Sequence, residues 1–302
     1  MPLRSRFPLG DRRPGRPAPA ALAELRAAMA ASPYPRAEGV AVTEYSPGGV
    51  RCVVATPQDG FRGEMIYFHG GGYRLGGPDR MAGFLTQLAA HIGCRVTAPA
   101  YSLAPDKPYP AALHDAAGVI EAVTAAAPKA PLVLGGDSAG GGLAAACCVA
   151  FGEGLPALRG AILLSPWLDL RVSAETFDRC ADTDLLFSRQ SATDAAEAYL
   201  QGLPADSPLA SPLLAPSLNG VPPTLVIAGS AEVLLQDSIN FTARLAEQHI
   251  GIQLIVVPDM QHVSPAIFPD LPSSAFGLEA ISRFARERLD DVGLRADPKP
   301  GP

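Results

Sequence analysis

A serine stands between two glycines in the motif G-D-S-A-G at Gly136–Gly140, after the apolar run Leu132–Leu134 and before an alanine-rich stretch. A chain that turns sharply from strand to helix can present this hydroxyl at the apex, with glycines leaving room for close backbone approach. The amide groups at the helix start then face developing negative charge. The pattern predicts Ser138 as a nucleophile. The alternatives are a glycine-rich loop with an incidental serine and a phosphate loop, but no G-x-x-x-x-G-K-[ST] motif supports the latter.

A run of three glycines begins at Gly70, directly after the apolar run 66–68 and His69. Consecutive glycines lose much backbone freedom on folding, so some function must require that bare backbone. Acyl transfer requires it, because several N–H groups must face the carbonyl oxygen of the substrate. We predict an oxyanion hole formed by the N–H groups of Gly70, Gly71 and Ala139, with His69 as an orienting residue. A flexible turn is the alternative.

Two histidines follow Ser138 in the chain, and either could act as its general base. His249 lies in a helix-like run, which favours a surface position. His262 comes just after the apolar run 253–257, the last predicted strand. A base must reach the nucleophile from the strand ends, so the sequence favours His262. A structural histidine is the alternative.

The acid that orients the base should follow the preceding strand. Hydrolases whose serine lies on a strand-to-helix turn have their catalytic residues in the chain order serine, acid, histidine. The run Thr224–Ile227 predicts that strand, and Glu232 and Asp237 both follow it. Asp237 is the alternative to Glu232, and we expect it on a helix surface or at a helix cap.

The two glycine motifs, about 65 residues apart, together resemble the bacterial hormone-sensitive-lipase-like esterases of the α/β-hydrolase superfamily. The resemblance extends over roughly residues 40–290. Ser102 departs from the family pattern, which usually has arginine there, so any ion pair of that arginine should be absent. Three further segments carry the resemblance: Tyr101-Ser-Leu-Ala-Pro-Asp106, Ser165-Pro-Trp-Leu-Asp169 and Pro208-Leu-Ala-Ser-Pro212.

The resemblance implies a serine carboxylesterase acting on small-molecule esters with short acyl chains. Glu232 lies 30 residues before His262, a separation similar to that of the family's acid, although aspartate is commoner there. We therefore predict the triad Ser138, Glu232 and His262. The mechanism needs no metal and no organic cofactor, and related esterases are often homodimers.

The same triad could serve acyl transfer, lactone opening or amide hydrolysis, because all of them share the acyl-enzyme. A non-catalytic ligand-binding homologue is a further alternative, and its expected mark is loss of the catalytic histidine. His262 is present with a plausible acid, which favours an enzyme.

Short apolar runs alternate with helical patterns along most of the chain, which predicts a mostly parallel sheet covered by helices on both faces. This is the α/β-hydrolase fold. Residues 20–31 favour a helix, and two further helices are indicated by apolar spacing at 81–92 and 278–289. The predicted strands are 51–56, 64–68, 95–99, 132–134, 161–164, 224–227 and 253–257.

Residues 171–212 break this alternation and are too long for a simple connection, so we expect a helical cap insertion there. The expected organisation is an N-terminal arm and cap helix (1–45), an α/β-hydrolase core (46–170 and 213–290) and a frayed tail (291–302). The substrate pocket should be roofed by the N-terminal helical segment and part of the insertion.

The composition excludes several classes of protein. A net charge of −6 argues against nucleic acid or an anionic membrane surface as partner. The five cysteines are odd in number and form no C-x-x-C pair, which argues against a disulfide framework or a zinc cage. The arginine-rich N-terminus is interrupted by prolines and glycines, so it does not predict a signal peptide. We expect a soluble, cytoplasmic protein.

Overall fold

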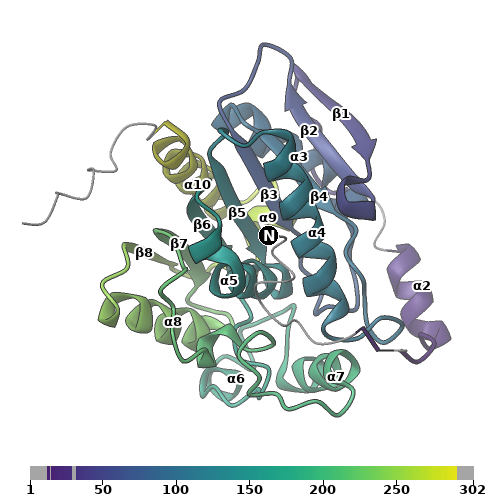
Figure 1. The fold of residues 1–302 in the computed structure, drawn as a ribbon. Helices are drawn as coiled ribbons and strands as arrows, with labels where there is room; N and C mark the ends of the chain where they lie inside the picture. The colour runs from purple at the N-terminus through teal and green to yellow at the C-terminus, as the bar shows by residue number, and fades with distance from the viewer. Residues whose placement is uncertain (1–11, 14, 29–31, 291–302) are drawn as a thin grey trace, which may run out of the picture.

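The computed structural model describes residues 12–13, 15–28 and 32–290 (Figure 1). Most of the predicted arm and the whole predicted tail, 291–302, lie outside the described residues, as do positions 29–31 of the predicted N-terminal helix. The part of that helix that is described runs from Ala20 to Ala28 as α2.

One eight-stranded sheet crosses the molecule in the order β1-β2-β4-β3-β5-β6-β7-β8. β2 runs antiparallel to both β1 and β4, and every pairing from β4 to β8 is parallel. The expected mostly parallel α/β-hydrolase fold is confirmed. The strands are β1 Val40–Tyr45, β2 Cys52–Pro57, β3 Glu64–Phe68, β4 Arg95–Pro99, β5 Leu132–Asp137, β6 Leu158–Leu164, β7 Thr224–Gly229 and β8 Ile252–Val257.

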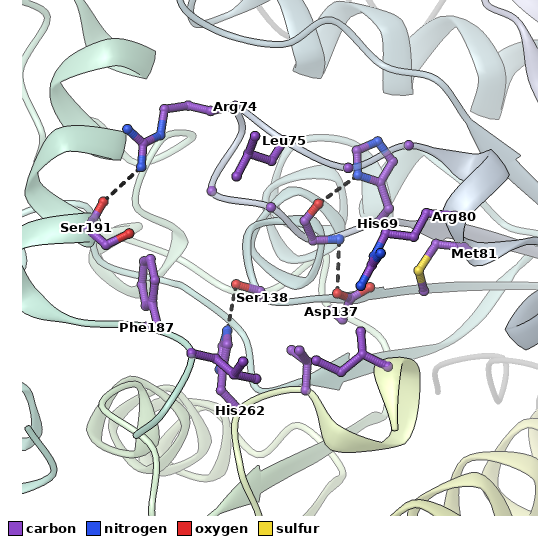
Figure 2. Close-up of a pocket in the computed structure, with 18 residues that line it drawn as sticks. His69, Arg74, Leu75, Arg80, Met81, Asp137, Ser138, Phe187, Ser191 and His262 are labelled. Carbon is purple, nitrogen blue, oxygen red and sulfur yellow. Dashed lines mark hydrogen bonds between the residues drawn. The ribbon is translucent and has the colours of Figure 1, made fainter. Parts of the chain in front are cut away.

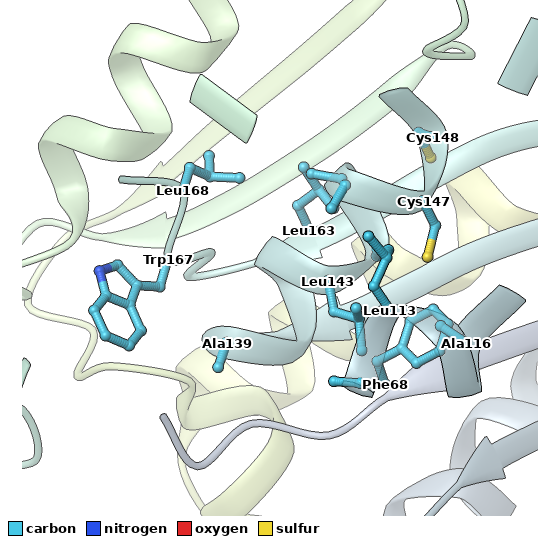
Figure 3. Close-up of a cluster of buried hydrophobic side chains, with 14 of the residues drawn as sticks. Phe68, Leu113, Ala116, Ala139, Leu143, Cys147, Cys148, Leu163, Trp167 and Leu168 are labelled. Atoms are coloured by element: carbon cyan, nitrogen blue, oxygen red, sulfur yellow. The ribbon is translucent and has the colours of Figure 1, made fainter. Parts of the chain in front are cut away.

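Helices cover both faces of this sheet, and each face has its own apolar cluster. α3 and α10 contribute to one cluster, and α4, α5 and α8 contribute to the other. The buried side chains around α5 include Ala139, Leu143 and Cys147, packed against Phe68 and Leu113 (Figure 3). The helices are α3 Pro78–Ile92, α4 Ala111–Ala126, α5 Ala139–Phe151, α6 Thr176–Arg179, α7 Arg189–Leu200, α8 Leu235–Glu247, α9 Ser264–Ile267 and α10 Pro272–Asp290.

All seven predicted strands are present, but β1 and α4 were not anticipated. β1 is an edge strand whose residues are all partly buried or exposed, so it shows no continuous apolar run. α4 has alanine at seven of its sixteen positions and is largely buried, which leaves little contrast between an apolar and a polar face. Apolar periodicity therefore gives a weak signal in both places.

The chain between β6 and β7, where we expected a cap insertion, forms α6 and α7, which lie together at the lower edge of the view in Figure 1. Two hydrogen bonds join distant parts of this segment. The Leu213 N–H donates to the carbonyl of Leu168, and Arg189 Nη1, from the start of α7, donates to that of Val172 at 2.7 Å.

The N-terminal segment supplies a cation beside Ser102, the position at which we expected no ion pair. The backbone N–H of Ser102 donates to Asp115 Oδ2 at 2.7 Å. The guanidinium of Arg12 pairs with the other oxygen of that buried carboxylate. An arginine distant in sequence thus neutralises Asp115.

Among the described residues, no helix is both long and apolar enough to cross a membrane. Within the same residues, no three histidine, cysteine or acidic side chains gather as a metal site would require.

The turn from β5 into α5 depends on the absence of a side chain at Gly140. A Cβ atom there would lie 2.0 Å from the carbonyl oxygen of Phe68 and 2.4 Å from that of His69. Both are backbone atoms of the neighbouring strand and loop, so they cannot move aside without disturbing the sheet.

We therefore expect Gly140→Ala to destabilise the protein by about 1–3 kcal/mol or more, because the added methyl overpacks a closed backbone contact. Gly251→Ala is the matched control, since its Cβ would meet nothing nearer than 3.6 Å. Urea denaturation of both variants gives the comparison. Equal midpoints for the two variants would contradict this account of the turn.

Candidate active site

The parallel strands bring their carboxyl ends to one edge of the sheet, and the candidate residues follow those ends. Ser138 follows β5, His69 follows β3, Glu232 follows β7 and His262 follows β8. Ligand sites in open α/β sheets form beyond this edge. Strand order therefore gathers side chains that are up to 193 positions apart in the sequence.

Ser138 occupies a strained backbone conformation, with φ 52° and ψ −121°, between the last residue of β5 and the first residue of α5. Non-glycine residues rarely adopt a positive φ, and such strain persists only where surrounding contacts enforce it. The Ser138 N–H donates to Leu164 on β6, and its carbonyl accepts from Gly142 and Trp167. The backbone is thus fixed on both sides of the hydroxyl.

The structure brings the three predicted triad residues together. Oγ of Ser138 lies 3.0 Å from Nε2 of His262, and Nδ1 of His262 lies 3.5 Å from Oε2 of Glu232. All three side chains are buried. The second separation is longer than an ordinary hydrogen bond, and Nδ1 has no hydrogen-bond partner among the described residues. The carboxylate therefore faces the imidazole within ion-pair distance.

Ser165, which follows β6, holds Glu232 in this position. Its hydroxyl donates to Oε2 of Glu232 at 2.7 Å and accepts from the N–H of Val263 at 3.1 Å. The same hydroxyl thus bridges the acid loop and the residue next to His262. Sequence reasoning did not identify Ser165, although it lies in the Ser-Pro-Trp segment that carries the family resemblance.

The environment of His262 raises the pKa of its imidazole. Burial acts in the opposite direction and lowers that pKa, but the adjacent Glu232 carboxylate, with the charges of Asp184 and Asp137, outweighs it. The Phe187 ring stacks on the imidazole, with centroids 5.6 Å apart and an angle of 13° between the planes. These contacts restrict how far the imidazole can rotate.

Of the N–H groups predicted to form the oxyanion hole, that of Gly70 is already in use. It donates to Oδ2 of Asp137 at 3.0 Å, and a Cβ at this position would lie 2.3 Å from the same oxygen. The assignment of Gly70 as an oxyanion donor is therefore wrong for this conformation. The N–H groups of Gly71, Gly72 and Ala139 have no acceptor among the described residues. Asp137, beside the nucleophile, thus secures the start of the glycine run.

His69 is placed to orient this loop. Its ring stacks on Tyr101 at a centroid distance of 4.2 Å, and the Tyr101 hydroxyl donates to the His69 carbonyl at 2.7 Å. Nδ1 lies 2.7 Å from the carbonyl oxygen of Gly70. Since a carbonyl can only accept, Nδ1 carries the proton. Burial lowers the pKa of His69 to about 4, so the ring is neutral at pH 7.

Asp237, the alternative acid, bonds to groups outside the triad. We expected it on a helix surface or at a cap, but it is buried in the first turn of α8, where Oδ2 accepts from the N–H groups of Leu168 and Asp169 at 2.9 and 3.0 Å. Burial raises its pKa to about 7. His249, the alternative base, is exposed after α8, as the sequence indicated.

Residues 183–187, which precede α7, contact both the loop that carries Glu232 and the loop that carries His262. Asp184 accepts from the N–H of Phe187 at 2.9 Å and, through its other oxygen, from that of Val233 at 2.9 Å. Gln261 Nε2 donates to the Thr183 carbonyl at 3.0 Å. Sequence reasoning noted Asp184 only as part of a polar stretch, because its partners lie far along the chain.

A pocket of about 240 Å³ opens above Ser138 (Figure 2). The glycine run forms one wall and Phe187 with Ser191 forms another. Two arginines, Arg74 and Arg80, also line it. The arrangement offers a nucleophile, a base and unpaired backbone donors within one small cavity.

Comparisons with known proteins agree with this geometry. A family model described as alpha/beta hydrolase fold matches residues 65–265. An acetyl-hydrolase from Streptomyces hygroscopicus is 32% identical over 74% of this chain and 75% of its own length. A hormone-sensitive lipase from a metagenome library superposes with a TM-score of 0.83 at 33% identity, over 90% of this chain and 94% of that one. An esterase of the bacterial hormone-sensitive-lipase family gives 0.81 at 30% identity, over 91% and 100%. The chain belongs to the bacterial hormone-sensitive-lipase-like esterases of the α/β-hydrolase fold.

Proposed function

We propose that this protein is a serine carboxylesterase that hydrolyses short- to medium-chain acyl esters through an acyl-enzyme, with Ser138, His262 and Glu232 as the triad. The observation that carries the proposal is the 3.0 Å contact between the Ser138 hydroxyl, on its strained turn, and Nε2 of His262. A nucleophile and a base at this separation satisfy the geometric requirement for proton transfer.

In the first half-reaction, Nε2 of His262 accepts the proton of Ser138 as Oγ attacks the ester carbonyl. The tetrahedral intermediate collapses, the carbon–oxygen bond to the alcohol breaks, and His262 protonates the leaving oxygen. In the second half-reaction, water gives a proton to His262 and attacks the acyl-enzyme, which releases the acid and restores Ser138. Glu232 keeps Nδ1 protonated and stabilises the imidazolium.

The oxyanion of that intermediate needs donors that the protein does not already use. We assign the N–H groups of Gly71, Gly72 and Ala139 to this role, with Gly72 replacing Gly70. Gly71 has φ 117° and Gly72 has φ 59°, conformations that glycine adopts without strain. Each donor in such a site typically contributes about 10²–10³-fold to the rate.

The size of the pocket supports short acyl chains. A volume of about 240 Å³ is below the usual range for pockets that enclose drug-sized ligands, roughly 300–1,000 Å³. The relative from Streptomyces hygroscopicus is named an acetyl-hydrolase, which is consistent with a small acyl group.

A cytoplasmic location is part of the same proposal. All five cysteines are buried and none forms a disulfide. Unpaired thiols are typical of proteins kept in a reducing compartment.

Ser138→Ala should lower kcat for p-nitrophenyl butyrate by on the order of 10⁴-fold or more, because the triad acts as a unit. Initial rates against the wild type, after correction for spontaneous hydrolysis, measure the effect. Full activity in the variant would exclude Ser138, and an inactive wild type would favour a ligand-binding homologue.

Because Glu232 raises the pKa of His262, the acid limb of the kcat/KM profile should have its midpoint above the ordinary value of about 6.5. The imidazole must be neutral to act as base, so activity is lost as the pH falls through that pKa. Glu232→Gln should lower kcat by about 10²–10⁴-fold and move the limb to lower pH, since the negative charge is gone.

The pH profile of each variant checks this expectation. Asp182→Asn, which removes an exposed acid of the neighbouring segment, is the matched control. A limb that stays in place in Glu232→Gln would show that this carboxylate does not act on His262.

Asp137→Ala should destabilise the protein by about 1–3 kcal/mol, because the Gly70 N–H loses its acceptor. It should also lower kcat more than it changes KM, since the loop that carries the oxyanion donors is released. Asp137→Asn retains an acceptor oxygen and should retain most of both properties. Urea denaturation and initial rates provide the measurements, and identical behaviour of the two variants would count against the anchoring role.

A further inference from the structure

We propose that Arg74 forms an anion subsite in the pocket beside Ser138, so that the preferred substrates are esters that also carry a carboxylate. The inference rests on the proposed function, because it names the substrate class of that same site. Its physical basis is a partly buried guanidinium in the pocket wall that has no carboxylate within ion-pair distance among the described residues.

The backbone of Arg74 is held firmly at the end of the glycine run. Its N–H donates to the carbonyl of Gly71 at 3.0 Å, and its carbonyl accepts from Nε of Arg26 at 2.8 Å. Arg26 belongs to α2 and also donates to the Ala104 carbonyl at 2.7 Å. The side chain therefore extends into the pocket wall from a backbone that is held in place. A substrate-binding side chain needs such support.

The hydrogen bonds of the guanidinium leave most of its donors unused. Nη2 donates to the carbonyl of Ser191 at 3.2 Å, and this is the only acceptor it finds among the described residues. Nε is shielded from solvent and has no partner within that part of the chain. An arginine carries five N–H donors, so one bond to a carbonyl does not saturate it.

No carboxylate oxygen of the described residues lies within 4.0 Å of the Arg74 guanidinium. Two acids of α7, Asp194 and Glu197, line a neighbouring cavity together with Arg74, but neither forms an ion pair with it. Oδ1 of Asp194 accepts from Nε2 of Gln190 at 2.8 Å. Burial lowers the pKa of Arg74, and the charge of Asp194 offsets only part of that effect. Removing a cation from water costs free energy that an incoming anion would recover.

The rest of the pocket wall also favours a negatively charged ligand. Figure 2 shows Arg74 with Ser191 and Phe187 on one side of Ser138, and Arg80 on the other. Asp137 is the one acid that lines this pocket within the described residues, and its Oδ2 is bonded to the Gly70 N–H. Two arginines and this one bonded acid therefore line the pocket, and Arg74 lies on the same side of Ser138 as Ser191 and Phe187.

A carboxylate is the anion that best matches this site, because a planar guanidinium binds it through two parallel charge-assisted hydrogen bonds. The carboxylate could belong to the acyl chain or to the alcohol of the ester. In either position the carboxylate would pair with Arg74 in the same way. Two pairs of test substrates, one with the carboxylate on the acyl side and one on the alcohol side, distinguish the two positions.

The experiment compares each carboxylated ester with its uncharged amide isostere. On the acyl side, mono-p-nitrophenyl adipate is paired with p-nitrophenyl 5-carbamoylpentanoate. On the alcohol side, 4-carboxyphenyl acetate is paired with 4-carbamoylphenyl acetate. The quantity measured is the ratio of kcat/KM values within a pair, which does not depend on the fraction of correctly folded enzyme.

We expect the wild type to prefer the carboxylate in one of the two pairs by about ten-fold or more, mainly through KM. Arg74→Gln should abolish that preference, and Arg74→Lys should retain part of it. Lys129→Gln is the charge-matched control and should leave the ratio unchanged. Lys129 is exposed and precedes β5, about 20 Å of strand away from Ser138.

Two results would overturn the subsite: no carboxylate preference in either pair, or a preference that Arg74→Gln leaves intact. A purely structural Arg74, linking the glycine run to α7, would lower the rates of both members of a pair equally. If neither p-nitrophenyl butyrate nor any of the paired esters is hydrolysed, the proposed function fails instead.

A binding measurement tests the subsite independently of turnover. Adipate should bind Ser138→Ala in calorimetry, and Ser138→Ala combined with Arg74→Gln should bind it about ten-fold more weakly. Equal affinity of the two proteins for adipate would rule out Arg74 as the anion site for the acyl chain. If the alcohol-side pair is the one that shows the preference, 4-hydroxybenzoate replaces adipate and the same comparison applies.

Discussion

The site depends on one backbone constraint, the turn that carries Ser138 from β5 into α5. The turn holds a non-glycine residue at φ 52°, and it closes so tightly that a side chain at Gly140 would overlap the carbonyl of Phe68 on β3. That contact sets the distance between the nucleophile and the loop after β3. The hydroxyl and the free glycine amides consequently share one small space.

Buried carboxylates then fix the loops around this turn, each by accepting hydrogen bonds from backbone or side-chain donors. Asp137 holds Gly70, Asp237 holds the loop after β6, and Asp184 holds the loop that carries Glu232. A buried acceptor without donors would be costly, so each pairing specifies where its loop must lie. Glu232 belongs to the same set but keeps Oε1 without a partner among the described residues and turns Oε2 toward Ser165 and His262.

The segment between β6 and β7 completes the pocket and contributes to its chemistry. Phe187 stacks on His262, while Ser191 contacts Arg74 from the first turn of α7. Asp184 connects this segment to the loop that carries Glu232. A movement of the segment would therefore shift the position of Glu232 relative to His262. This wall of the pocket and the candidate triad are therefore connected through direct contacts.

The sequence by itself determined most of the strands and the candidate side chains of the triad. Short apolar runs specified seven of the eight strands. The G-D-S-A-G motif identified Ser138, the position after the last predicted strand identified His262, and chain order with the family resemblance identified Glu232. The structure brings these three side chains together. Only the tertiary structure decided which groups are already occupied. It showed that Asp137 uses the Gly70 N–H, that Asp237 is buried rather than exposed, and that Ser165 bridges Glu232 and Val263. The physical reason is one of range: periodicity and turn chemistry act over a few residues, whereas these donors and acceptors are 67 to 98 positions apart and meet only once the strands are aligned.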